Sequence, residues 1–264
     1  MRRLLSAAAL LVAAACAPAL REPPPVTVLA TKAGSGSAAE LLAAADGKWK
    51  LRPDLASVRE AEKLYLQAAR ADESDAAGFV GAVRAKAWLV DHVAEQATRE
   101  ADAVSAVQTA QWCARRQPGL AACDFWLAIA VGLQAREVRQ TAESGMKTMV
   151  EALERAIAKD AAYERGGPHR VLALVLLRAP GWPLGPGDAE EGLVHARAAV
   201  ALAPDYAPNV LALAEAHADL REHAEAKSDY EKARTLAAGA KAAGDPDAEA
   251  WIAEAERGIA ASAR

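Results

Sequence analysis

The residues best able to do acid–base chemistry or to bind a metal are five histidines, at positions His92, His169, His195, His217 and His223. A helix brings two imidazoles onto one face when they stand four residues apart, as in the His-Glu-x-x-His motif of zinc enzymes. No two of these histidines have that spacing. The sequence therefore predicts neither a histidine-based metal site nor a catalytic triad.

A serine and a lysine, Ser144 and Lys147, have the Ser-x-x-Lys spacing of penicillin-binding enzymes. Those enzymes also need a Ser-Asp-Asn and a Lys-Thr-Gly motif carried on a sheet. Here Asn does not follow Ser228-Asp229, and Gly does not follow Lys147-Thr148. An envelope hydrolase is thus the weakest of the functions considered, and we expect a non-catalytic protein without a metal or cofactor.

The first cysteine, Cys16, ends a segment that is typical of a secretion leader. Arg2-Arg3 precedes an apolar run that is too short to remain as a membrane-spanning helix. Leu11-Val12-Ala13-Ala14-Ala15-Cys16 resembles a bacterial lipobox, with Ala13 where that motif usually has Leu. We expect residues 1–15 to be a lipoprotein signal peptide and Cys16 to be the lipidated N-terminus. The alternative is an ordinary signal peptide with an incidental cysteine.

The residue after this cysteine is Ala17 rather than Asp, which resembles outer-membrane sorting in enteric bacteria. It predicts a periplasm-facing protein that is lipid-anchored to the outer membrane. Residues 16–37 are rich in Pro, Gly, Ser and Thr and have no helical period, so we expect a flexible tether. Removal of Arg2 and Arg3 changes the formal net charge from −4 to −6, which makes nucleic acid and anionic membrane surfaces poor partners. We therefore expect contact with the membrane through the N-terminal lipid only.

The other two cysteines, Cys113 and Cys123, each stand five residues from Pro118. They would lie on opposite arms of a helical hairpin that turns at Pro118-Gly119, in a compartment that permits disulfides. A bond between them would close a short loop and stabilise the fold by roughly 2.5–3 kcal/mol in the chain-entropy model. The alternative is two small side chains buried at close-packing positions.

Beyond the tether, Ala, Leu, Glu, Arg and Lys dominate and alternating Val- and Ile-rich runs are missing, which predicts an all-α protein without a sheet. Residues 38–264 are expected to form a single domain of about ten or eleven antiparallel helices, compact rather than an open solenoid. The expected helices cover residues 38–46, 56–72, 75–91, 94–116, 120–137, 141–160, 168–179, 188–203, 207–220, 223–239 and 247–262.

A repeat of 34 residues indicates how these helices stack. Gly192, Ala196, Ala199 and Pro204 are followed at that period by Ala226, Tyr230, Ala233 and Ala238, which resembles a tetratricopeptide repeat. The resemblance implies a tetratricopeptide-like domain with degenerate repeats. The usual concave positions of its first helix predict a groove that includes Leu211, Glu215 and Asp219. The alternative for the two carboxylates is a solvated surface pair.

Two expected helices are apolar nearly all round, over residues 123–133 and 171–177. Such helices must be covered on both sides, either in the centre of the body or at an apolar tunnel or subunit interface. A loop follows the second of them, over residues 180–187, and its three prolines and three glycines display Trp182, Pro183 and Leu184. We consider it a partner-docking loop, with Trp182 folded onto neighbouring helices as the alternative.

The segment Gly166-Gly167-Pro168-His169-Arg170, followed by Gly181-Trp182-Pro183 and Gly187-Asp188, resembles the TatT family, the tetratricopeptide-like lipoprotein component of some TRAP transporters. The resemblance covers roughly residues 163–236. It implies a periplasmic lipoprotein that associates with the solute-binding subunit of a TRAP transporter, and it leaves open a homo-oligomer that encloses an apolar passage. A general scaffold for envelope assembly is the alternative function.

Overall fold

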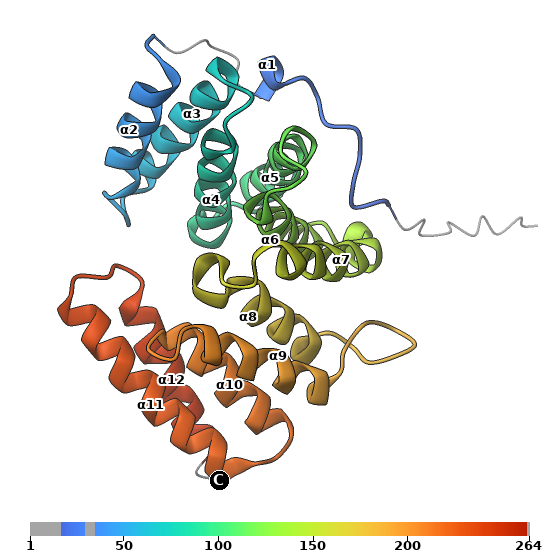
Figure 1. Cartoon of the computed structure of the whole chain (residues 1–264), viewed down its shortest axis with the longest axis vertical. Coiled ribbons are helices and arrows are strands. Elements are labelled where there is room, and N and C mark those ends of the chain that lie inside the picture. Colours follow the sequence, from blue (N-terminus) through green and yellow to red (C-terminus); the bar gives the residue numbers. More distant parts are fainter. Residues whose placement is uncertain (1–16, 30–34, 263–264) are drawn as a thin grey trace, which may run out of the picture.

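The computed structural model describes residues 17–29 and 35–262, and it confirms the predicted all-α fold (Figure 1). Within these residues the chain forms twelve α-helices, one 3-10 turn and no strand. The elements are α1 (Val26–Leu29), α2 (Ala38–Trp49), α3 (Leu55–Ala71), α4 (Ala76–His92), α5 (Gln96–Arg116), α6 (Ala121–Glu137), η1 (Arg139–Thr141), α7 (Ala142–Asp160), α8 (Tyr163–Arg178), α9 (Ala189–Leu202), α10 (Ala207–Asp219), α11 (His223–Ala242) and α12 (Ala248–Ser262).

Side-chain caps explain where several of these helices begin. Ser37 and Glu40 form a capping box at α2, and Asp54, Asp75 and Asp188 accept backbone N–H bonds at the starts of α3, α4 and α9. Each cap satisfies an N–H group that has no partner within the helix.

None of the helices in the described part of the chain is long and apolar enough to cross a membrane.

The helices are arranged as stacked hairpins. From α2 to α12 every helix packs on the next, and each even-numbered helix also contacts the next even-numbered one. The odd-numbered helices from α3 onward make no such contacts with one another in the described residues. The even-numbered helices therefore form the inner layer of a curved stack, the arrangement of a tetratricopeptide superhelix.

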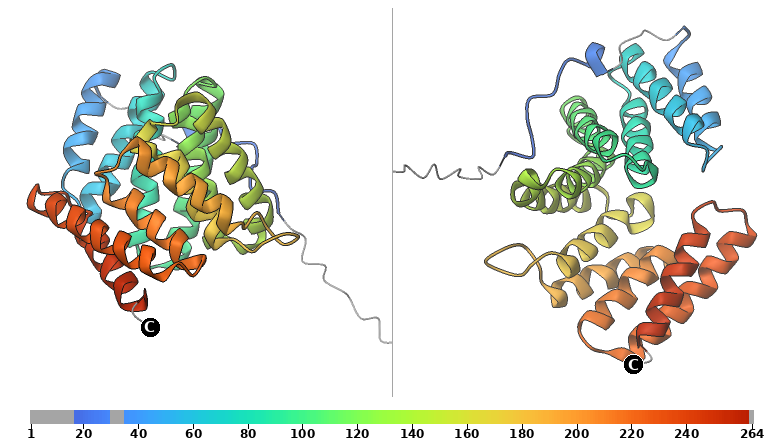
Figure 2. Two further views of the ribbon diagram at one scale, coloured as in Figure 1. Left: turned by 60° about the horizontal axis from the view of Figure 1, so that its bottom comes forward. Right: turned by 180° about the vertical axis from the view of Figure 1, so that it is seen from behind.

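The two ends of this stack approach each other, which makes the body compact (Figures 1 and 2). Arg52, after α2, has its Nη2 atom 4.0 Å from Oδ2 of Asp247, before α12. The small residues of the 34-residue pattern are fully buried where helices cross, at positions Ala196, Ala199, Ala226 and Ala233. Large side chains at these positions would push the helices apart.

The largest change to the expected helix bounds is at α8, which starts at Tyr163 rather than near residue 168. Glu164, Arg165 and Gly166 have left-handed backbone angles, so a kink separates the first turn from the regular helix. Non-glycine residues adopt this conformation at a cost of about 1–2 kcal/mol each. The sequence pattern shows only the regular part, which begins with Pro168 in its first turn.

The expected tether also needs a correction. Residues 17–29, the first of its two described parts, lie along the body and are called the strap below. Trp112 Nε1 donates a hydrogen bond of 2.8 Å to the carbonyl oxygen of Pro24, and Val26 is buried beside Phe79. Arg115 forms two hydrogen bonds with Glu22. Burial of apolar side chains and these polar contacts offset the entropy that a free linker would retain.

Candidate docking site at the α8–α9 loop

The connection between α8 and α9, residues 179–188, leaves the body as a loop with a closed neck (Figure 1). Gly187 N–H donates to the carbonyl oxygen of Pro180 at 2.9 Å, and Asp188 N–H donates to that of Leu176 at 2.9 Å. A Cβ atom at position 187 would overlap the carbonyl oxygen of Ala179, so only glycine fits there. The loop is consequently fixed at its base although its tip projects outward.

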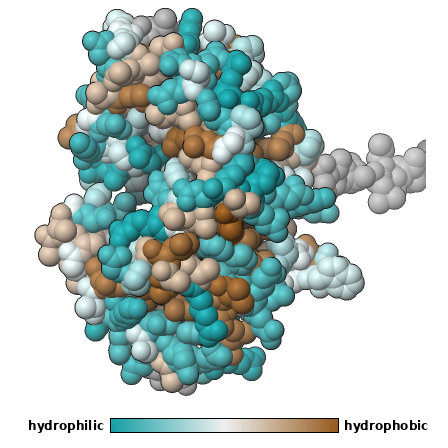
Figure 3. Space-filling view, in the orientation of Figure 1, coloured by the Kyte–Doolittle hydropathy of each residue, from teal (hydrophilic) through white to brown (hydrophobic). Residues whose placement is uncertain are grey.

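The tip of this loop exposes large apolar side chains. Trp182 is 90% exposed and Leu184 is 76% exposed, the highest values among the large apolar residues that the structure describes. Figure 3 shows the loop standing clear of the body in the lower half of the molecule. The alternative interpretation, in which Trp182 folds onto neighbouring helices, is therefore wrong.

An open cleft of about 650 Å³ lies between the loop, α7 and the strap, and we call it the loop cleft. Its apolar wall comes from Met146 and Val150 of α7 and from Pro183 and Leu184 of the loop. Trp182 is not part of this wall. The complete lining is Ala17, Pro18, Glu143, Ser144, Met146, Lys147, Val150, Glu151, Pro183, Leu184, Gly185 and Pro186.

Ser144 has a structural part in this cleft. Its hydroxyl donates to the carbonyl oxygen of Ala17 at 2.9 Å and accepts the N–H group of Ala19 at 2.9 Å. Lys147 lines the same cleft. The serine that resembles a nucleophile in the sequence thus holds the strap on α7.

A second cleft of about 670 Å³, the apolar cleft, lies between α6, α7 and α8. Met146 lines both clefts. The two helical stretches that are apolar nearly all round supply much of its wall through Ile129, Leu133, Val171, Leu174 and Val175, with Arg136 and Arg178 among the polar residues. Other side chains of these stretches, such as Phe125 and Leu172, are buried in the core. One face of these stretches is therefore core and another face lines an open cleft, while a tunnel or a subunit interface stays a prediction.

The predicted groove of the best repeat is occupied by the chain's own side chains. Leu211 is only 4% exposed and packs in the core with Val210 and Ala233. Glu215 accepts two hydrogen bonds of 2.6 Å from the guanidinium of Arg178. Only Asp219 of the predicted set is exposed. This face of α10 is packing surface rather than an open groove.

Electrostatics around Glu215 follow from that packing. Its hydrogen bonds raise the pKa of Arg178, and partial burial followed by the nearby Glu215 charge raises the pKa of Asp219. Burial is also the main cause that raises the pKa of Tyr230 to about 12. The shifts of Asp219 and Tyr230 indicate that both groups are partly dehydrated beside the Arg178–Glu215 ion pair.

The residues of the Gly166-to-Arg170 motif join the two halves of the stack. A Cβ atom at Gly166 would lie 3.1 Å from the carbonyl oxygen of Ala199, and one at Gly167 would lie 3.2 Å from the Phe125 ring. Arg170 donates a 2.8 Å hydrogen bond to Asn209, whose amide in turn donates to the Ala199 carbonyl. The motif thus packs α8 closely against α6, α9 and α10.

Sequence spacing did not reveal a histidine pair between α8 and α9. Nδ1 of His169 lies 2.8 Å from Nδ1 of His195, so one ring donates a hydrogen bond to the other. Burial lowers the pKa of both histidines, which favours the neutral rings that this contact needs. The described residues contain no group of three or more His, Cys, Asp or Glu side chains placed to hold a metal ion.

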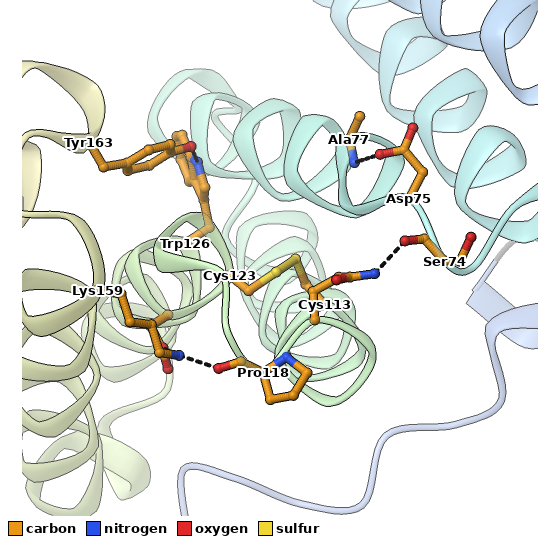
Figure 4. Close-up of a disulfide and its surroundings, with 11 residues drawn as sticks. Ser74, Asp75, Ala77, Cys113, Pro118, Cys123, Trp126, Lys159 and Tyr163 are labelled. Atoms are coloured by element: carbon orange, nitrogen blue, oxygen red, sulfur yellow. Dashed lines mark hydrogen bonds and ion pairs between the residues drawn. A yellow bond between two sulfur atoms is a disulfide. The ribbon is translucent and has the colours of Figure 1, made fainter.

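A disulfide joins Cys113 of α5 to Cys123 of α6 across the turn at Pro118 (Figure 4). Lys159 of α7 donates to the carbonyl oxygen of Pro118 and so ties the same turn to the next helix. Both cysteine side chains are buried in the cluster that holds Val26 of the strap.

The expected lipidation residue, Cys16, lies outside the described residues.

No protein-family model matches the chain, and no curated protein matches its sequence. Among solved structures, TTC0263, a thermophilic TPR (tetratricopeptide-repeat) protein in Thermus thermophilus, is similar with a TM-score of 0.61 and 18% identity over 83% of this chain and 98% of that chain. MamA protein gives a TM-score of 0.48 and 15% identity over 77% of this chain and 93% of that chain. The likeness to TTC0263 confirms the tetratricopeptide-like fold.

Proposed function

We propose that this chain is a non-catalytic, lipid-anchored periplasmic protein that acts as an accessory component of a TRAP-type solute transporter by docking its solute-binding subunit. The observation that carries the proposal is the loop cleft, an open apolar surface beside a loop whose neck is fixed by backbone hydrogen bonds. Its residues include Pro183 of the Gly181-Trp182-Pro183 segment, which resembles the TatT family.

The loop cleft has the physical properties of a docking surface. Pro183 and Leu184 are held in place before any partner arrives, so binding would order few additional groups. Met146 and Val150 supply apolar surface opposite them, and Glu143, Lys147 and Glu151 supply polar groups in the same wall. An apolar centre with a polar rim is the usual anatomy of a protein–protein interface.

The anchoring part of the proposal concerns Cys16, which we propose as the lipidated residue that attaches the protein to the outer membrane. Cys16→Ala is expected to release the protein from the membrane fraction, because the acyl chains would supply its strongest membrane affinity. Fractionation and palmitate labelling measure this. Palmitate labelling that persists in the variant would assign the lipid to another residue.

The docking part is tested with purified full-length protein and the solute-binding subunit of a TRAP transporter from the same cell. Leu184→Asp places a charge in the cleft wall and should weaken binding at least about tenfold, which corresponds to ~1.4 kcal/mol. Leu120→Asp is the matched control, since Leu120 is also exposed and stands at the N-cap of α6, where Asp is favourable.

The outcome of this comparison separates two functions. Equal binding by wild type and both variants would exclude the loop cleft as the docking surface. An absence of binding by wild-type protein would favour the second candidate function, a scaffold for envelope assembly, which the repeat fold also suits.

A further inference from the structure

We infer that the tip of the α8–α9 loop, carried by Trp182, contacts the interfacial layer of the bilayer to which the protein is anchored. This inference rests on the proposed function in one respect, the lipidation of Cys16. It adds a membrane-facing element that orients the body and separates the role of Trp182 from that of Pro183 and Leu184.

The anchor point and the loop lie side by side. Ala17 and Pro18 line the loop cleft together with Pro183 and Leu184. The start of the strap and the loop are also on the same side of the body in Figure 1 and in both views of Figure 2. Consecutive Cα atoms are about 3.8 Å apart, so a lipid on the residue before Ala17 is attached within one peptide unit of this cleft.

The strap keeps that attachment point in place. Ala17 N–H donates to the carbonyl oxygen of Gln140 at 2.8 Å, and the Ala17 carbonyl accepts from Ser144. Ala19 is 2% exposed and packs in the core beside Leu127. The anchor therefore joins a fixed point of the folded body rather than the far end of a free linker, and the loop beside it is held near the membrane surface.

The tip has the composition of an interfacial segment. Residues 179–187 contain no charged side chain, and Trp182 is the almost fully exposed indole among them. Tryptophan is enriched at membrane–water interfaces, where its apolar ring meets the acyl chains and its N–H group stays hydrated.

The backbone of the loop is also suited to a poorly hydrated environment. Pro180, Pro183 and Pro186 have no N–H group. The N–H groups of Leu184 and Gly185 donate to the Gly181 carbonyl, and Gly187 donates to Pro180. Six of the eight positions from 180 to 187 thus carry no N–H group that needs water, which lowers the cost of entering the interface.

A bilayer explains the position of Trp182 better than a protein partner does. Pro183 and Leu184 line the cleft, but Trp182 does not. One indole contacts a membrane too weakly to recruit a protein with an acidic net charge. Once the lipid holds the protein at the surface, however, the contact becomes intramolecular and its effective concentration reaches about the millimolar range.

The test uses full-length lipidated protein in vesicles of phosphatidylethanolamine and phosphatidylglycerol, with either ordinary or brominated acyl chains. Bromine quenches indoles that reach the membrane, and the chain has six Trp residues. We expect Trp182→Phe to lose most of the bromine-dependent quenching of the wild type. Trp251→Phe is the matched control, because Trp251 is half-buried on α12 against Tyr206 and should not be quenched.

Each outcome decides the inference. If bromine quenches wild type and Trp182→Phe equally, Trp182 does not contact the membrane. Co-flotation of the same protein with the vesicles would still support the lipid anchor. Protein that does not co-float overturns both the anchor and the contact. A third outcome is that bromine does not quench the protein and that Trp182 emission changes only when the solute-binding subunit is added. This outcome also overturns the membrane contact, and it assigns Trp182 to the solute-binding subunit.

Discussion

Two surfaces of this chain have the sequence features of a binding site, but one is covered by neighbouring helices and the other is exposed. On α10 the groove positions of the best repeat are filled, because Leu211 lies in the core and Glu215 is held by Arg178. On the α8–α9 loop the side chains of Trp182 and Leu184 remain exposed beside an open cleft. The regular repeat positions on α10 are thus packing surface, whereas the irregular α8–α9 loop is accessible surface.

The difference has a physical origin in the helices that pack beside each surface. Leu211 of α10 packs with Ala233 of α11 and Ala255 of α12, and these neighbours fill its groove position. Arg178, the last residue of α8, turns its guanidinium onto the carboxylate of Glu215. Among the described residues, no helix covers the tip of the loop that follows Arg178, so Trp182 is 90% exposed. Accessible apolar surface is therefore found where the repeat is interrupted.

The strongest challenge to this comparison is Leu211→Ala. If Leu211 is a core residue, the change should lower the free energy of unfolding by about 2–5 kcal/mol, because it leaves a cavity beside Val210 and Ala233. Chemical denaturation measures the effect. A loss of less than ~0.5 kcal/mol would mean that Leu211 faces an open groove after all.

Gly187→Ala tests the fixed neck of the loop. The added methyl group overlaps the Ala179 carbonyl oxygen, so we expect a loss of roughly 1–3 kcal/mol and a displaced loop. Gly239→Ala is the control, since a Cβ atom at position 239 meets nothing within 4 Å. Thermal melting of the two variants compares them, and equal midpoints would contradict a closed neck.

Asp219→Asn tests the packed face of α10 through the pH dependence of protein stability. Burial and Glu215 raise the native pKa of Asp219, so the native state binds this proton more tightly than the unfolded chain. The ionised carboxylate then destabilises the fold above its native pKa, and this effect disappears as pH falls below the unfolded value, ~3.9.

We expect Asp219→Asn to be more stable than wild type near neutral pH by about 0.5 kcal/mol at most, because solvent screens this exposed site. The advantage should shrink as the pH is lowered, and melting midpoints across the acidic range measure it. A constant difference at every pH would assign the effect to something other than this carboxylate.

Trp182→Ala should have the smallest effect on stability. The side chain is almost fully exposed, so the free energy of unfolding should change by less than about 0.5 kcal/mol. Denaturation curves of the variant and the wild type check this. A loss of about 3–5 kcal/mol, typical of a buried tryptophan, would place Trp182 inside the fold.

Helix positions were predictable because they depend on local signals. The helix-favouring composition and the 34-residue spacing of small residues predict helices and helix crossings that the structure contains. The left-handed turn at Glu164 and Arg165 was not predictable, since neither residue type favours it and tertiary packing imposes it.

Contacts between distant segments were also beyond reach of the sequence. The strap is held by Ser144 and Trp112, which stand far along the chain from it. The His169–His195 contact and the buried pair of Glu62 and Lys86 join different helices. At the site, Pro-Gly spacing predicted a stiff loop, but which apolar residues it would expose depended on whether a neighbouring helix covered them.

Photo-crosslinking from position 184 directly tests whether the solute-binding subunit docks at the loop cleft. A benzoylphenylalanine replaces Leu184 in full-length protein expressed in cells that contain the TRAP solute-binding subunit, and the same probe at Leu120 serves as the control. Docking at the loop cleft predicts an adduct with the solute-binding subunit from position 184 and none from position 120. Capture of that subunit from neither position, or equally from both, would contradict docking at the loop cleft.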